Sequence, residues 1–150
     1  TAEEGINHFL SHVSREERLS FISMYATLGA WGGIVMRSLP GETGCWFCMK
    51  KWQEQYPDKL VAPLDEQGEI QPPGCGDLTF TGAGFDLQKV ALADVRLAVS
   101  TLCRGEEGGY PDCNWDWGVL RLVDEQGEPL PPTWTVEKLN VHPDCPYAHD

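Results

Sequence analysis

Apolar residues recur with a helical period near the start of the chain. In residues 2–18, Phe9, Leu10 and Val13 form an apolar stripe, and polar side chains occupy the other faces. This spacing is typical of an amphipathic helix. We therefore expect a helix over residues 2–18.

The clearest helical pattern is GFDLQKVALADVRLAVSTLC, residues 84–103. Alanine and valine also occur on its other faces, so we expect a largely buried helix. Arg104 and Gly105 supply a C-terminal stop. The apolar positions that follow the i, i+3, i+4 rule are Leu87, Val90, Ala91, Val95, Ala98 and Leu102.

Short apolar runs predict strands on both sides of this helix. Residues 21–26 and 34–39 are expected to be buried strands divided by a glycine-rich turn. Residues 119–123 and 133–136 surround DEQGEPLPP and predict a C-terminal β-hairpin. Residues 50–76 show no such pattern, and we expect a long irregular loop there.

Composition is consistent with one globular domain or a fragment spanning residues 1–150. The chain is 41% apolar and 23% charged, and no apolar run approaches the ~20 residues of a membrane helix. The first residues are acidic and do not resemble a signal peptide. We therefore expect a cytoplasmic protein with no membrane partner.

The net charge of −12 narrows the class of partner. Nucleic-acid binding requires a basic patch that displaces counterions from phosphates, and the sequence has no Lys/Arg cluster. We expect no nucleic-acid partner. Anionic membrane surfaces are disfavoured for the same reason.

Six cysteines are the most informative residues. An even number permits disulfides, but a chain of this length can build a core without them. In a reducing compartment such cysteines more often bind metal or react. They are Cys45, Cys48, Cys75, Cys103, Cys113 and Cys145.

Cys45 and Cys48 form a Cys-x-x-Cys after a predicted strand and a Pro-Gly turn. Two such thiolates can reach one Zn²⁺ at ~2.3 Å. A redox pair would need a helix N-terminus in a thioredoxin-like context, whereas this position predicts a tight turn. The motif therefore predicts half of a tetrahedral zinc site.

The tail, VHPDCPYAHD, offers the other half. Cys145 can combine with His149, four residues later, or with His142, three residues earlier, to give a Cys₃His site. Cys113 is a weaker candidate ligand. The alternative is an exposed tail in which neither histidine binds metal.

Other candidates have less support from the sequence. Cys75 lies between two glycines and is a candidate nucleophile, although no partner base is evident. Cys103 is expected to fill a buried space. His8 and His12 share a helical face and could bind metal, but a surface position is the commoner outcome.

The order of these features resembles the second half of the ThiF/MoeB adenylyltransferases, the family that includes ubiquitin-activating enzymes. FISMYATLGAWGGIVMRSLPGETGCWFC is similar to the family's strand-glycine-strand segment and first zinc pair. CGDLTFTGAGFDLQKVALADVRLAVSTL is similar to its crossover segment and buried helix, and HPDCPYAH to its C-terminal cysteine pair.

The resemblance implies the C-terminal half of an α/β, ThiF-like adenylation domain, with strands around a buried helix, a β-hairpin and a zinc clasp, and a possible homodimer. Cys45 and Cys48 match the family's first zinc pair, and Cys145 matches the first cysteine of the second. Position 148 is alanine, so His149, or alternatively His142, is expected as the fourth ligand. Cys75 falls where some members carry a thiol that links to their carrier protein.

The resemblance also implies a function. Family members use ATP and Mg²⁺ to adenylate the C-terminal carboxylate of a ubiquitin-like or sulfur-carrier protein. The family's ATP site lies mainly in its first half, which has no counterpart in this sequence. We therefore expect the chain alone to be inactive and to work with its own N-terminal ATP-binding half. The alternative is a zinc-stabilised, non-catalytic protein-binding module, and a third possibility is an extracellular disulfide-bonded domain.

Overall fold

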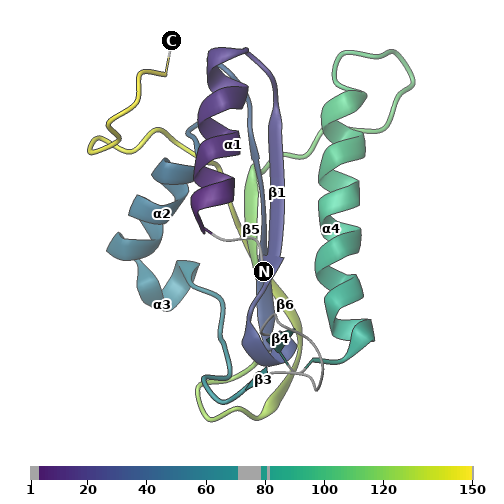
Figure 1. Ribbon diagram of the computed structural model, residues 1–150. Coiled ribbons are helices and arrows are strands. Elements are labelled where there is room, and N and C mark those ends of the chain that lie inside the picture. The colour runs from purple at the N-terminus through teal and green to yellow at the C-terminus, as the bar shows by residue number, and fades with distance from the viewer. Residues whose placement is uncertain (1–3, 71–78, 81, 150) are drawn as a thin grey trace.

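A four-stranded antiparallel sheet forms the centre of the molecule in the computed structural model, which describes residues 4–70, 79–80 and 82–149 (Figure 1). The strand order is β1-β2-β5-β6. A separate two-stranded ribbon pairs β3 with β4. The strands are β1 Phe21–Ala26, β2 Gly32–Ser38, β3 Glu69–Ile70, β4 Thr79–Phe80, β5 Trp117–Val123 and β6 Pro129–Glu137.

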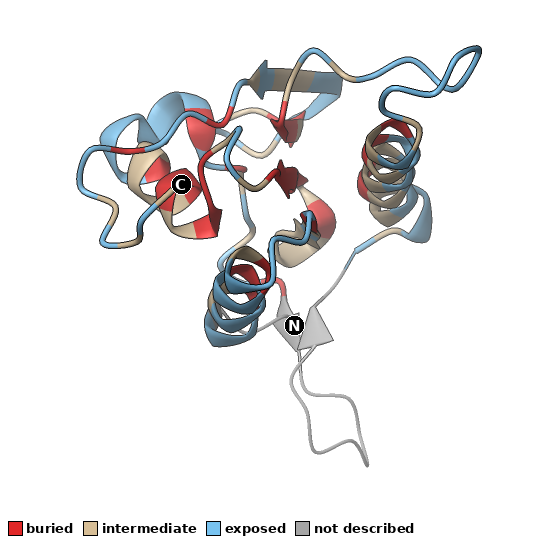
Figure 2. Ribbon diagram, turned by 90° about the horizontal axis from the view of Figure 1, so that it is seen from above, coloured by how far each residue is buried: buried red, intermediate tan, exposed pale blue. Residues whose placement is uncertain are grey.

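Helices lie on both faces of this sheet. α1 and α2 cover one face, and α4 covers the other, against β1 and β2 (Figures 1 and 2). The helices are α1 Glu4–Glu16, α2 Trp46–Gln55, α3 Pro57–Leu60 and α4 Gly84–Leu102, with a short 3₁₀ turn η1 at Leu28–Ala30. The fold is thus mixed α/β with an antiparallel sheet.

Strand β2 is buried along its whole length and divides two apolar cores. Successive side chains of a strand point to opposite faces. Ile34 and Met36 accordingly join the core beneath α2, and Val35 joins the core beneath α4. A Cβ on Gly33 would lie 2.6 Å from a methyl group of Val90, so glycine is required for α4 to pack this closely.

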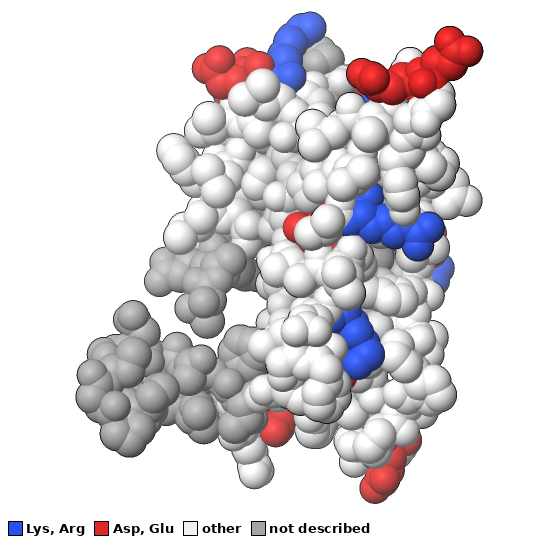
Figure 3. Space-filling model, turned by 90° about the vertical axis from the view of Figure 1, so that its right-hand side faces the viewer, with Lys and Arg blue, Asp and Glu red and all other residues white. Residues whose placement is uncertain are grey.

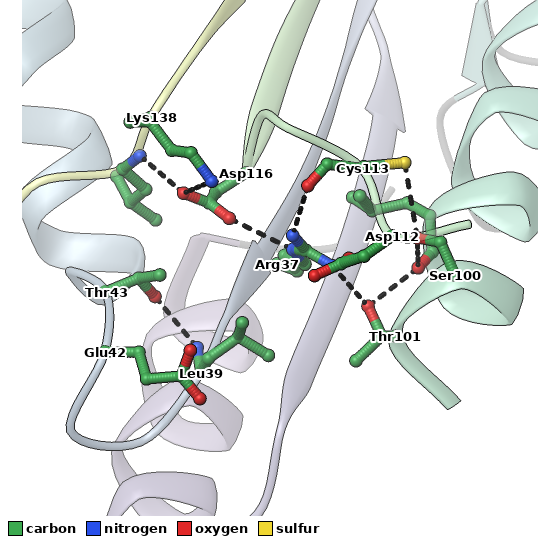
Figure 4. A network of polar contacts seen from close by, with 12 residues as sticks. Arg37, Leu39, Glu42, Thr43, Ser100, Thr101, Asp112, Cys113, Asp116 and Lys138 are labelled. Carbon is green, nitrogen blue, oxygen red and sulfur yellow. Dashed lines mark hydrogen bonds and ion pairs between the residues drawn. The ribbon is translucent and has the colours of Figure 1, made fainter. Parts of the chain in front are cut away.

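A buried ion-pair network fixes the end of β2 (Figure 4). The Arg37 guanidinium donates to Asp116 Oδ1 at 3.0 Å, to Asp112 Oδ1 at 2.6 Å and to the Cys113 carbonyl at 2.9 Å. Asp116 Oδ2 accepts from the Leu139 N–H at 3.2 Å. The network connects β2 to the segment after α4 and to the start of the tail.

The predicted strands are confirmed. Residues 21–26 form β1, the run at 34–39 lies within β2 and its end, and the C-terminal hairpin is β5-β6. The expected irregular loop over residues 50–76 is wrong in its first part and at Glu69–Ile70, which form β3, and its residues 71–76 lie outside the described residues. Helices α2 and α3 occupy positions up to Leu60, because Trp46, Met49 and Gln53 share one buried helical face.

Both long helices expose more apolar surface than the sequence predicts. In α4, Val90 and Leu97 are buried, but Val95 is 57% exposed and Leu102 is 80% exposed. A largely buried α4 is therefore not observed. In α1, the polar residue Asn7 is buried, whereas Phe9 is 63% exposed. An apolar stripe shows which residues share a face, but it does not show that the rest of the chain covers that face.

Among the residues described, no helix combines the length and apolar character needed to cross a membrane.

Candidate metal centre

The Cys-x-x-Cys opens helix α2. Cys45 is the N-cap residue in an extended conformation, and Cys48 lies in the first turn. The tight turn expected from the sequence is therefore replaced by a helix N-terminus. The positive end of the helix dipole favours thiolates at this position.

The tail runs back along this helix start. The Gly44 N–H donates to the Leu139 carbonyl at 2.6 Å, and Trp52 Nε1 donates to the Asn140 carbonyl at 2.9 Å. A Cβ on Gly44 would lie 2.7 Å from the Asn140 carbonyl oxygen, so glycine is needed for the two segments to pass. This arrangement brings Cys145 beside Cys45.

Four ligand atoms converge at this point: Sγ of Cys45, Cys48 and Cys145 and Nε2 of His149. All lie within 4.8 Å of one another. The Cys45–Cys48 and Cys45–Cys145 sulfur distances are 3.8 and 3.7 Å. His149 Nε2 lies 3.4 Å from the Cys48 sulfur and 3.2 Å from the Cys145 sulfur.

These distances fit one tetrahedral ion. Bonds of about 2.3 Å to sulfur and about 2.05 Å to nitrogen give tetrahedral S–S edges of about 3.8 Å and S–N edges of about 3.5 Å. Disulfides would require about 2.05 Å between the sulfurs, and the described cysteines are free thiols. The cluster Cys45, Cys48, Cys145 and His149 could therefore hold a metal ion such as zinc.

Proximity of the thiols shifts their acidities in opposite directions. The hydrogen bond with Cys48, together with burial, raises the pKa of Cys45 well above its usual range. The same hydrogen bond lowers the pKa of Cys48. Burial raises the pKa of Cys145. Without a cation the cluster cannot easily hold several thiolates, and a bound divalent ion would remove this constraint.

The alternative fourth ligand, His142, does not lie in the cluster. Its ring packs edge-on against Trp52 at 4.5 Å between centroids, and its Nδ1 accepts from the Asp144 N–H at 3.1 Å. Its backbone carbonyl accepts from the Cys145 N–H at 3.0 Å. His142 thus shapes the turn that presents Cys145.

Tyr147, between the two tail ligands, was not predicted from the sequence. Its hydroxyl contacts Nε2 of His8, and its ring lies edge-on to Phe47. The rings of His12 and Tyr147 are 5.4 Å apart. The two histidines of α1 are therefore packing partners of the tail. The only sequence signal for this contact is that each pair of candidate ligands encloses an aromatic residue, Phe47 in the first pair and Tyr147 in the second.

The remaining cysteines lie elsewhere. Cys103 is the half-buried C-cap of α4, and Cys113 lies with its sulfur 3.2 Å from Ser100 Oγ. The structure does not bring either into the metal cluster. Cys75, the candidate nucleophile, lies outside the described residues.

A cleft of about 730 Å³ lies on the α2 side of the sheet, beside β1. Its walls are largely apolar and include Met24, Trp46 and Leu64. Lys50 and Glu54 of α2 line it as well. The cleft therefore offers apolar surface next to the first strand of the sheet.

Two proteins of Sinorhizobium fredii (strain NBRC 101917 / NGR234) are similar to the chain. Uncharacterized protein y4qC is 36% identical in an alignment of 156 residues, gaps included, and the alignment covers 97% of the chain and 25% of y4qC. Uncharacterized protein y4oA is 33% identical over 138 residues, which cover 91% of the chain and 22% of y4oA. The chain thus spans about a quarter of the length of these relatives. No family model matches the chain.

Proposed function

We propose that Cys45, Cys48, Cys145 and His149 bind one structural Zn²⁺ that fastens the tail to the start of α2. The observation that carries this proposal is the convergence of four ligand atoms within 4.8 Å of one another. Three thiols and one imidazole are a donor set that zinc prefers. Four protein ligands fill a tetrahedral ion, so the site has no open position for catalysis.

The metal content of the purified chain tests this assignment. We expect one zinc per chain, and Cys45→Ser should lower the bound zinc severalfold. Cys103→Ser is the matched control, because Cys103 lies outside the cluster, and it should leave the zinc content unchanged. Equal zinc content in all three proteins would refute the site.

For the whole protein we propose a ThiF/MoeB-type adenylyltransferase that activates the C-terminal carboxylate of a ubiquitin-like or sulfur-carrier protein. Support comes from the order of motifs along the chain and from the pairing of Cys45 and Cys48 with Cys145. The length of y4qC and y4oA leaves room in those relatives for an ATP- and Mg²⁺-binding half. In this proposal the chain itself contributes the four-stranded sheet and the zinc site. Cys75 is a candidate thiol for a covalent link to the carrier protein.

ATP–pyrophosphate exchange tests the adenylyltransferase proposal. The assay would use the complete reading frame that encodes this chain, with candidate carrier proteins from the neighbouring genes. We expect exchange that depends on the carrier's C-terminal carboxylate and none with the 150-residue chain alone. Failure of the complete protein to exchange with any carrier would contradict the proposal.

A zinc-stabilised, non-catalytic binding module is the second candidate. The exposed apolar faces of α1 and α4 favour it, because they are surfaces on which another protein could pack. Such a module would bind zinc and a protein partner, but its complete reading frame would show no carrier-dependent exchange.

A further inference from the structure

Strand β1 has an unprotected edge. Within the described residues it is an outer strand of the sheet and pairs with β2. In an antiparallel pair, part of the backbone N–H and C=O groups of an outer strand point away from the sheet. Its sequence, FISMYA, has no proline, lysine or other charged residue to prevent further pairing.

The opposite edge is different. β6 carries Pro129, Pro131 and Pro132, together with Glu137. Prolines cannot donate to a neighbouring strand, so they protect an edge that faces solvent. Of the two outer strands, β1 therefore has the edge that is less protected against pairing with another strand.

Helix α4 covers one face of β1 and has a second apolar face that nothing in the described structure covers. Phe85, Leu92 and Val99 recur every seven residues along the helix, and so do Val95 and Leu102. All five side chains are exposed, Phe85 and Leu92 each by 68%. This repeat places them in one stripe along the helix, on positions of the kind that pack against a neighbouring helix.

Helix α1, on the other face of β1, has the same property. Its buried side includes the polar residues Asn7 and Ser11, and Asn7 accepts a hydrogen bond from Ser23 of β1 at 2.8 Å. Its exposed side chains include Ile6, Phe9 and Leu10. The strongly apolar side of α1 therefore faces away from the core of this unit (Figure 2).

Charge is balanced on α4, which carries two acidic and two basic residues, Asp86, Lys89, Asp94 and Arg96. Figure 3 views the side that carries α4 and shows large white areas, interrupted by Lys and Arg side chains near the middle and top, with acidic side chains mainly near the upper and lower ends. The whole chain has a net charge of −12, whereas the charges of α4 cancel. An exposed apolar area with no excess of either charge is typical of an interface.

We propose that the edge of β1 and the exposed apolar faces of α1 and α4 form one docking surface for a second α/β unit of the same polypeptide. That unit adds a strand to β1 and packs its own helices on α1 and α4. A single peptide or helix would cover one of these three features. A layered unit whose sheet continues from β1 covers all three.

The relatives support an occupant from the same polypeptide. They match nearly the whole chain, yet the match covers only 25% of y4qC and 22% of y4oA. They therefore contain ample further chain that could supply such a unit. This inference deepens the proposed function, because the docked unit would be the ATP-binding half, but the surface itself is argued independently of any activity.

A substitution placed in two contexts tests the surface. Val95→Glu changes α4, and the matched control Val136→Glu changes an exposed valine on β6, which is 44% exposed. In the 150-residue chain both variants should melt within about 2 °C of the parent, because surface substitutions have small effects. In the complete reading frame, Val95→Glu should lower the melting temperature by at least about 5 °C, whereas Val136→Glu should not.

Hydrogen exchange provides the second measurement. The amides of β1 should exchange at least about tenfold more slowly in the complete protein than in the 150-residue chain, and those of β6 should not change. Equal exchange of β1 in both proteins, or equal effects of Val95→Glu in both, would overturn the proposal. A complete reading frame with no further α/β unit would also overturn the proposal. Protection of β1 that rises with the concentration of the 150-residue chain would overturn it as well, because it would identify a second copy of the chain as the occupant.

These readouts separate this inference from the proposed activity. Protection of β1 without carrier-dependent pyrophosphate exchange would support the docking surface and contradict the adenylyltransferase. Carrier-dependent pyrophosphate exchange without protection of β1 would support the adenylyltransferase and contradict the docking surface.

Discussion

The two histidines of the tail have different surroundings. His149 Nε2 lies 3.4 Å from the Cys48 sulfur, whereas His142 packs on Trp52 and shapes the turn before Cys145. We expect His149→Ala to weaken zinc binding by at least about tenfold, because it removes a ligand. His142→Ala should retain stoichiometric zinc and lose stability through packing. Competition with a chromogenic chelator measures both affinities.

The reverse result would identify His142 as the ligand in solution. Loss of zinc only in His142→Ala, with His149→Ala unchanged, would contradict the observed geometry. His149→Cys is a useful companion variant, because a thiolate can replace the imidazole in a zinc site and should restore the affinity.

Asp94 of α4 is a carboxylate in an unfavourable environment. Among the described residues its Oδ1 is a buried oxygen without a hydrogen-bond partner, and burial raises the pKa of its carboxyl above the ordinary value of 3.8. A raised pKa in the folded state means that ionisation opposes folding. The resulting cost is absent below about pH 3.8, grows as pH rises through the folded pKa, and is complete at neutral pH.

We therefore predict that Asp94→Asn raises the melting temperature at pH 7 by a few degrees at most, and that this gain shrinks as pH falls towards 4. Asp86→Asn is the control on the same helix. Asp86 pairs with Lys89 at 2.7 Å, so its substitution should give no gain at pH 7. A gain from Asp94→Asn that is equal at both pH values would show that burial of the charge is not its cause.

At the scale of elements, α1 and the tail are held together by aromatic side chains. Tyr147 contacts His8, and its ring lies 5.4 Å from that of His12 and 6.0 Å from that of Phe47. We predict that Tyr147→Ala speeds hydrogen exchange in α1 by about tenfold or more and leaves β2 and β5 unchanged. Tyr110→Ala is the control, because Tyr110 is an exposed aromatic residue outside this cluster. Unchanged exchange in α1 would mean that Asn7 and its neighbours suffice to hold the helix.

The sequence predicted the elements whose pattern is simple. β1, β2 and the β5-β6 hairpin follow apolar runs bounded by turn residues, and the Cys-x-x-Cys spacing indicated two members of the cluster that could hold a metal ion. Helix α2 was missed in the sequence, although Trp46, Met49 and Gln53 follow a helical spacing, because the charged and amide side chains among residues 50–55 obscure that pattern.

Which face of a helix is covered cannot be obtained from its own residues. The stripes of α1 and α4 were visible in the sequence, but Phe9 and Leu102 are exposed because no described part of the chain packs over them. The choice between His149 and His142 was open for a similar reason. Both spacings from Cys145 permit ligation, and only the path of the tail along α2 shows that His149 lies in the cluster and His142 does not.

At the scale of the whole molecule, the candidate metal cluster and the core between the sheet and α4 are separate parts of the structure. The core between the sheet and α4 contains Val35, Val90 and Leu120 and shares no residue with the metal cluster. The cluster instead joins the core beneath α2, in which Cys45 and Cys48 are buried. Removing the metal should therefore loosen the α2 side of the molecule first.

We predict that a strong zinc chelator lowers the melting temperature by at least about 5 °C. A ligand whose free concentration is 100 times its Kd adds about 2.7 kcal/mol to the free energy of unfolding, and the chelator removes this contribution. Hydrogen exchange should accelerate in residues 140–149 and in α1, while β2 and β5 keep most of their protection. Added Zn²⁺ should reverse both effects and release protons, since the raised pKa values of Cys45 and Cys145 leave these thiols protonated in the metal-free protein. Uniform loss of protection across all strands would instead show that the zinc site and the sheet unfold as a single cooperative unit.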